Sequence, residues 1–153
     1  MKQRRLLTAL MLAAILALAI AGPASAAKLG GADQGGRLLT TTLTGEQEVP
    51  VKGDPDGIGF ATVTVNPGQG VLCYELSVSG IAQATAAHIH EAPVGVAGPV
   101  VKELLPPTDG SSGGCIDVGR ALAKDILKNP ADYYVNVHNA EYPAGALRGQ
   151  LSK

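Results

Sequence analysis

Residues 60–78, FATVTVNPGQGVLCYELSV, indicate the fold class of this chain. In the first six residues, alanine and two valines alternate with phenylalanine and two threonines, a period of two that is typical of a strand with one buried face. The next five residues, NPGQG, favour a turn, and β-branched and apolar residues return in VLCYELSV. The stretch therefore predicts an antiparallel β-hairpin.

Short segments of the same kind lie on both sides of this hairpin. They are LLTTTLTG (38–45), TAAHIHEA (85–92), GPVVKEL (98–104), YYVNVHNA (133–140) and GALRGQL (145–151). Gly, Pro, Asn and Asp separate them, and no long amphipathic helix intervenes. With one Phe and four Tyr in the chain, the core is expected to consist of Val, Leu, Ile and Ala. The pattern predicts an all-β fold, an antiparallel, Greek-key-like β-sandwich.

One short helix is predicted within IDVGRALAKDILKNP (116–130). Asp117 or Gly119 would start it, and Pro130 would end it. Partial helical spacing comes from its apolar positions Ala121, Ile126 and Leu127. We expect this helix to pack over one end of the sheets.

The N-terminal residues have the pattern of a secretory signal peptide. Basic residues in MKQRR precede an apolar stretch, residues 6–21, that is short for a membrane span of roughly 20 residues. The small residues ASA at 24–26 match a signal-peptidase site. We therefore expect a signal peptide over 1–26, a flexible Gly-rich leader over 27–36 and one domain over 37–153. The mature protein would be secreted or periplasmic, with no membrane span.

The charge of the mature chain disfavours polyanionic partners. Three of the 12 basic residues lie in the expected signal peptide, which leaves nine against 13 acidic residues, a formal charge of −4 over 127 residues. No basic run is present. Nucleic acid and anionic membrane surfaces are therefore not the expected partners.

Cys73 and Cys115 are the only cysteines. In an oxidising compartment, a disulfide between them is the expected state, and a reactive thiol is the alternative. By the chain-entropy argument, such a cross-link stabilises a fold by roughly 3 to 4 kcal/mol.

The three histidines are the main candidates for chemistry. His88 and His90 are two apart on one expected strand, so they project to the same side, while Ala87 and Ile89 face the other way. The same alternation in YYVNVHN sets His138 apart from the valines. If the valine and isoleucine faces point into the core, all three imidazoles point out of it.

Two interpretations of these histidines stay open. Three neutral imidazoles can hold Zn or Cu and leave one coordination position free. Alternatively, the rings hydrogen-bond to loop backbone and anchor the segment PVGVAGP that follows. Glu91, Asp117 and Glu141 are possible auxiliary ligands, although carboxylates in turns are more often solvated or capping groups.

Arg148 is a further candidate because it lies in the last expected strand, where an arginine needs a partner. It could form a structural ion pair or guide an anion to a metal. The ion pair is the favoured interpretation. No Ser-His-Asp set, phosphate-binding Gly loop or paired-carboxylate motif stands out.

Much of the mature chain resembles the CHRD domain, the module named after chordin and also found in secreted bacterial proteins. The similar stretches are LTGEQEVP (43–50), GFATVTV (59–65), LCYELSVSGI (72–81), AAHIHEAPVGVAGPVV (86–101) and NPADYYVNVHNAEYPAGALRGQL (129–151). The resemblance implies a β-sandwich. It implies no activity, because bacterial members mostly have none assigned, and in chordin the modules belong to an extracellular antagonist of signalling ligands.

The chain departs from the CHRD pattern at two positions. Members often have a second Pro after EVP and an acidic residue in the turn before the Arg. Here Val51 follows Pro50, and Ala146 precedes Leu147. If the acidic residue normally pairs with the arginine, Arg148 needs another partner.

A more distant resemblance is to copper/zinc superoxide dismutase, where a His-x-His on one strand and a later histidine bind copper. It implies that His88, His90 and His138 are copper ligands and that Arg148 guides anions. The full dismutase site does not carry over, because the mature chain has no further histidine for a zinc site.

These observations favour a secreted, non-catalytic CHRD module that binds an unknown extracellular or periplasmic protein or ligand. The module would also carry a metal ion at its three histidines, with copper as the expected metal. The alternative is a copper-dependent redox enzyme of the superoxide dismutase type. A third possibility is a purely structural module, in which the histidines contribute only to stability.

Overall fold

The computed structural model describes residues 35–153, and the expected signal peptide and most of the leader lie outside the described residues. The strands are β1 (Arg37–Thr44), β2 (Ile58–Asn66), β3 (Val71–Ser79), β4 (Ala84–Glu91), β5 (Val100–Leu104), β6 (Ser111–Asp117), β7 (Tyr133–Asn139) and β8 (Leu147–Gln150). The helical elements are η2 (Gly45–Gln47), α1 (Gly119–Lys128) and η3 (Pro130–Asp132). No helix within residues 35–153 is long and apolar enough to cross a membrane.

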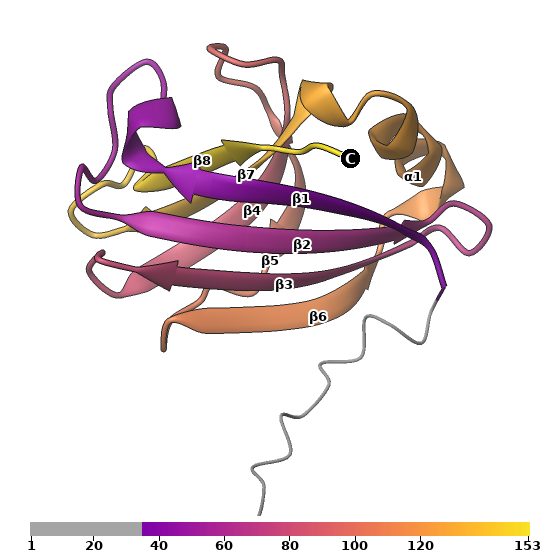
Figure 1. Ribbon diagram of the computed structural model, residues 1–153, viewed down its shortest axis with the longest axis horizontal. Coiled ribbons are helices and arrows are strands. Elements are labelled where there is room, and N and C mark those ends of the chain that lie inside the picture. The colour runs from indigo at the N-terminus through magenta and orange to yellow at the C-terminus, as the bar shows by residue number, and fades with distance from the viewer. Residues whose placement is uncertain (1–34) are drawn as a thin grey trace, which may run out of the picture.

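All strands belong to one eight-stranded sheet with the order β5-β4-β7-β8-β1-β2-β3-β6. The sheet curls so that β1, β2, β3 and β6 form one layer and β4, β5 and β7 the other (Figure 1). The chain changes layer after β3, after β5 and after β6, as Greek-key connections do. The predicted antiparallel β-sandwich with one short α-helix is confirmed.

The hairpin expected from residues 60–78 is formed by β2 and β3. Their antiparallel register is continuous from the Ile58–Ser79 pair to the Asn66–Val71 pair. The alternation is also as expected, since Ala61, Val63 and Val65 are buried and Phe60 on the opposite face is 47 % exposed. The core is largely aliphatic, with Tyr74 and Tyr133 added.

Strand β6 was not predicted from the sequence. Its residues, SSGGCID, are mostly small, and Gly and Ser are poor strand formers by propensity. The strand exists because all seven of its residues pair with β3 and because Cys115 lies directly opposite Cys73. The expected Cys73–Cys115 disulfide is formed and joins these two strands.

Helix α1 forms within the predicted segment and covers one end of the sandwich (Figure 1). Asp117 accepts a hydrogen bond from the backbone N–H of Gly119, which stabilises the start of the helix. The buried face consists of Ala123 and Ile126. Ala121 is exposed, so its assignment to the apolar face was wrong; the helix turns it towards solvent.

Candidate metal centre

The histidines lie on the outer face of the layer formed by β4 and β7. Ala87 and Ile89 of β4 and Val137 of β7 are almost completely buried in the core between the layers. Side chains alternate between the two faces along a strand, and residues paired across adjacent strands project from the same face. His88, His90 and His138 therefore project away from that core. The face assignment made from the sequence is correct.

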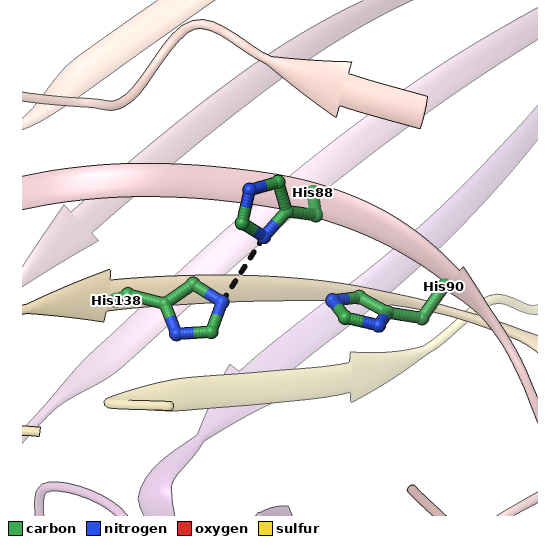
Figure 2. Close-up of side chains that lie close together, drawn as sticks. All are labelled: His88, His90 and His138. Atoms are coloured by element: carbon green, nitrogen blue, oxygen red, sulfur yellow. Dashed lines mark hydrogen bonds between the residues drawn. The ribbon is translucent and has the colours of Figure 1, made fainter. Parts of the chain in front are cut away.

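The structure also brings the three imidazoles together. One ring nitrogen from each lies within 4.8 Å of one from each of the others, so that together the three rings could hold a metal ion. The centroids of the His88 and His138 rings are 4.9 Å apart, and those of His88 and His90 are 5.5 Å apart. Figure 2 shows the rings turned towards a common space between β4 and β7.

Backbone carbonyls fix the proton positions on two of the rings. Nδ1 of His90 lies 2.9 Å from the carbonyl oxygen of Gly98, and Nδ1 of His138 lies 3.1 Å from that of Pro143. A carbonyl oxygen only accepts, so both Nδ1 atoms carry the hydrogen and both Nε2 atoms present a lone pair. The Nε2 atom of His90 is buried and makes no hydrogen bond.

The two interpretations of the histidines are therefore compatible. His90 and His138 anchor loop backbone through Nδ1, His90 in the PVGVAGP segment as the structural interpretation requires, and both offer Nε2 to a metal ion. This division of roles is common at metal sites, where a ligating histidine donates its other ring N–H to a fixed acceptor.

Burial keeps the imidazoles neutral. It lowers the pKa of all three histidines, and the neighbouring imidazoles lower the pKa of His88 further. At neutral pH each ring is therefore uncharged and has a lone pair on one nitrogen. A cation can bind without first displacing a proton from an imidazolium.

The segment Ala92–Gly98 covers His90, and side chains of the outer face hold it in place. His90 binds the Gly98 carbonyl, and the hydroxyl of Tyr134 accepts a hydrogen bond from the Gly98 N–H. Gln150 donates to the carbonyl of Ala92 at 2.7 Å. Gly98 is required here because a Cβ atom would overlap the carbonyl of Glu91.

Arg148 is part of the same arrangement, and the ion pair favoured from the sequence is not formed. Arg148 is 2 % exposed, and its guanidinium donates to the carbonyls of Pro93 and Val96 and to the side chain of Gln150. Within residues 35–153, the one direct ion pair joins Lys52 to Glu46 at the surface. Loop carbonyls satisfy the buried guanidinium instead of a carboxylate.

Arg148 also connects to the histidines through a stack of side chains. Its guanidinium carbon lies 3.5 Å from the centre of the Tyr134 ring, and Tyr134 stacks in turn on His90 with ring centroids 4.7 Å apart and planes at 8°. A planar cation and two rings thus form one layered unit. The stack fixes the plane of the His90 ring.

Glu48 is a buried residue of this face that the sequence did not indicate. It is 3 % exposed and accepts a hydrogen bond from the side-chain amide of Asn136, which lies between His88 and Arg148 in the sheet. Burial raises the pKa of Glu48 to about 7, although the charge of Arg148 and hydrogen bonds from Val49 and Asn136 oppose this shift. In the sequence, Glu48 lies in GEQEVP, where an acidic side chain is expected to be solvated.

Replacing Glu48 by Gln should remove a pH dependence of stability. The folded carboxyl releases its proton near pH 7 and the unfolded one near pH 4.5, so the folded state binds more protons between these values and loses stability as the pH rises. The slope for one such group approaches about 1.4 kcal/mol per pH unit. Urea unfolding in chelator between pH 5 and 7 measures it. The histidines titrate in both proteins, so the difference between the wild-type and Glu48→Gln curves of stability against pH isolates this group. Parallel curves for the two proteins would contradict the expectation.

The auxiliary ligands considered from the sequence are not part of the cluster. The group of side chains with metal-ligand spacing among residues 35–153 contains the three histidines and none of Glu91, Asp117 or Glu141. Asp117 instead serves the start of α1, and Glu141 lies in the turn after β7, where Asn139 binds its backbone N–H.

Comparison with known proteins assigns the chain to a family. No curated protein and no solved structure shows a significant match to the chain. The profile of the CHRD domain matches residues 39–151, which include every strand that carries a histidine of the cluster. The chain therefore belongs to the CHRD domain family.

Proposed function

We propose that this protein is an extracellular CHRD binding module that holds one copper or zinc ion at His88, His90 and His138. The observation that supports it is the convergence of three ring nitrogens within 4.8 Å, one of them a buried Nε2 with no other partner. A buried polar atom without a partner is costly unless a ligand satisfies it. The protein or other ligand that the module recognises would be extracellular as well.

The donor set favours copper and zinc over other metals. Neutral imidazole suits both ions, whereas calcium and magnesium prefer oxygen ligands. Three protein ligands leave a coordination position for water or for an atom of a partner. His88 and His138 are only partly buried, so this side of the cluster is reachable from solvent.

Metal content is the direct test. The mature protein, exported through a periplasm and purified without a chelator or histidine tag, should contain about one copper or zinc per chain by elemental analysis. His90→Ala and His138→Ala should lose the metal while keeping the circular dichroism spectrum of the wild type. A wild type that takes up no metal even after incubation with Cu(II) and Zn(II) would contradict the proposal.

Metal binding should also stabilise the fold. An ion that binds only the folded state stabilises it by about 2.7 kcal/mol at a free concentration 100 times its dissociation constant. We expect Zn(II) to raise the melting temperature of the wild type and to leave that of His138→Ala unchanged. Equal curves for the wild type in Zn(II) and in chelator would instead indicate a purely structural role for the histidines.

A copper-dependent redox enzyme of the superoxide dismutase type is the second candidate, and the partly exposed side of the cluster is the observation that favours it. Arg148 is not placed to guide an anion from solution, because its guanidinium is buried beneath Tyr134 and the loop. A superoxide assay of the copper-loaded protein separates the candidates. Activity that disappears in His88→Ala would favour the enzyme, and a copper-loaded but inactive protein would favour the binding module.

A further inference from the structure

His88 differs from the other two histidines of the cluster in how its ring is held. His90 and His138 each donate Nδ1–H to a backbone carbonyl. Within the described residues, the hydrogen bond that the His88 side chain makes is to the cluster itself, from Nδ1 to Nε2 of His138 at 3.1 Å. Figure 2 shows the second nitrogen of His88 turned away from the other rings. His88 thus lacks an acceptor for the nitrogen that would not bind the metal.

Glu103 of β5 is placed to supply that acceptor. It is the residue directly opposite His88 in the antiparallel β4–β5 pair, so the two side chains project from the same face. Directly opposite residues have Cβ atoms about 5 Å apart, within reach of a glutamate and an imidazole. The charge of Glu103 is already felt at the ring, because it raises the pKa of His88 against the effects of burial and the other histidines.

No other residue of β5 offers such a group to the cluster. A β-bulge shifts the register between Ile89 and His90, so that Lys102 pairs with Ile89 and Val100 with His90. Lys102 therefore lies on the face opposite to the cluster, and Val100 carries no polar side chain. Glu103 is the acidic residue that the register places beside a ligand.

We propose that Glu103 is the positioning residue of the metal centre, where it accepts a hydrogen bond from Nε2–H of His88 and so directs Nδ1 to the ion. This inference rests on the proposed function. In the metal-free cluster, Nδ1 of His88 donates to His138, whose Nε2 is an acceptor. Binding of a metal through Nδ1 would require the other neutral tautomer of His88: Nδ1 gives its proton to water and Nε2 takes one up from water, so no net proton is released and the hydrogen on Nε2 is available to Glu103.

Two physical effects follow from this contact. A carboxylate that accepts the second ring N–H fixes the tautomer and the orientation of a ligating histidine, and it makes the ligating nitrogen a stronger donor. Its negative charge also compensates part of the charge of a divalent cation. Every ligand of the cluster would then have its own acceptor: the carbonyls of Gly98 and Pro143 for His90 and His138, and Glu103 for His88.

The test compares Zn(II) affinity in Glu103→Ala, Glu103→Gln and the control Glu75→Ala, measured by competition with a chromophoric chelator. Glu75 is an exposed glutamate on β3, in the other layer, so its loss changes net charge without touching the cluster. We expect Glu103→Ala to weaken binding by about 10- to 100-fold and Glu75→Ala to leave it unchanged. Gln keeps an acceptor oxygen without the charge, so Glu103→Gln should fall between them.

A second measurement separates positioning from simple charge. Nitrogen-15 shifts of the Zn(II)-loaded protein report which ring nitrogen of His88 binds the ion. We expect Nδ1 in the wild type and in Glu103→Gln, and a mixture of Nδ1 and Nε2 in Glu103→Ala. Weaker binding with Nδ1 coordination kept in Glu103→Ala would overturn the positioning role, as would an affinity equal to that of Glu75→Ala. A wild type without Zn(II) affinity would overturn the metal centre itself, a result distinct from both.

Discussion

Replacing Arg148 by Met should lower the free energy of unfolding by about 3 to 6 kcal/mol, because it removes two hydrogen bonds from a charged group that contribute about 1.5 to 3 kcal/mol each. Methionine keeps much of the apolar stem, so the loss isolates the guanidinium. The carbonyls of Pro93 and Val96, two exposed residues of the loop, would lose this donor. Glu48 would also lose the nearby positive charge that favours its ionised form.

Urea unfolding of the metal-free protein at pH 7 measures this change. Arg120→Met is the matched control, since Arg120 is exposed on α1, and we expect it to stay within about 0.5 kcal/mol of the wild type. A loss below about 1 kcal/mol in Arg148→Met would mean that water replaces the guanidinium at the loop carbonyls. In that case Arg148 would not hold the loop over His90.

Removing the disulfide should have an effect of similar size. A cross-link between cysteines 42 positions apart constrains the unfolded chain by about 4 kcal/mol in the entropy argument. The Cys73→Ala/Cys115→Ala double variant should therefore unfold at much lower urea concentration. Cys115 is exposed on the edge strand β6, so dithiothreitol should reach the bond in the folded protein and lower the stability of the wild type to that of the variant.

The control for this experiment is the double variant itself, whose unfolding curve should not respond to dithiothreitol. A wild type whose stability is the same with and without reductant, under conditions where mass spectrometry shows the thiols free, would contradict the expected contribution. The loop that the disulfide closes contains β4, and with it His88 and His90. A reduced protein should therefore also bind metal more weakly if unfolding of β6 spreads to this layer.

The sequence predicted those parts of the fold that depend on local periodicity. Alternation in β2, β4 and β7 identified the buried faces and placed the three histidines on the outer face, and Pro130 marked the region where α1 ends. It failed at β6, where partner strand and disulfide impose extended backbone on residues without strand propensity. Alternation also cannot show what covers an outer face.

The candidate site was predicted in its ligands and not in its surroundings. The segments around Glu48 and Ala92–Gly98 fold over the outer face of β4, β7 and β8, and their contacts span 50 or more residues in sequence. The burial of Glu48 was therefore not predicted, and Arg148, expected to pair with a carboxylate, is buried against loop carbonyls instead. The pairing of Glu103 with His88 depends on the β4–β5 register, which a bulge shifts two residues away.

The strand order has a consequence for the order in which the protein can fold. Strand β8, the last of the chain, lies between β7 and β1 and is the link between the two halves of the sheet. During synthesis, which begins at the N-terminus, the chain can form the β1–β2–β3 meander early, because those pairings are local. The layer of β4, β5 and β7 is joined to this meander through β8, so it and Arg148 take their places only after residues 147–152 have been made. In an incomplete chain, β1 would thus be an edge strand without its β8 partner. The histidine cluster would be among the last parts of the molecule to reach its folded arrangement.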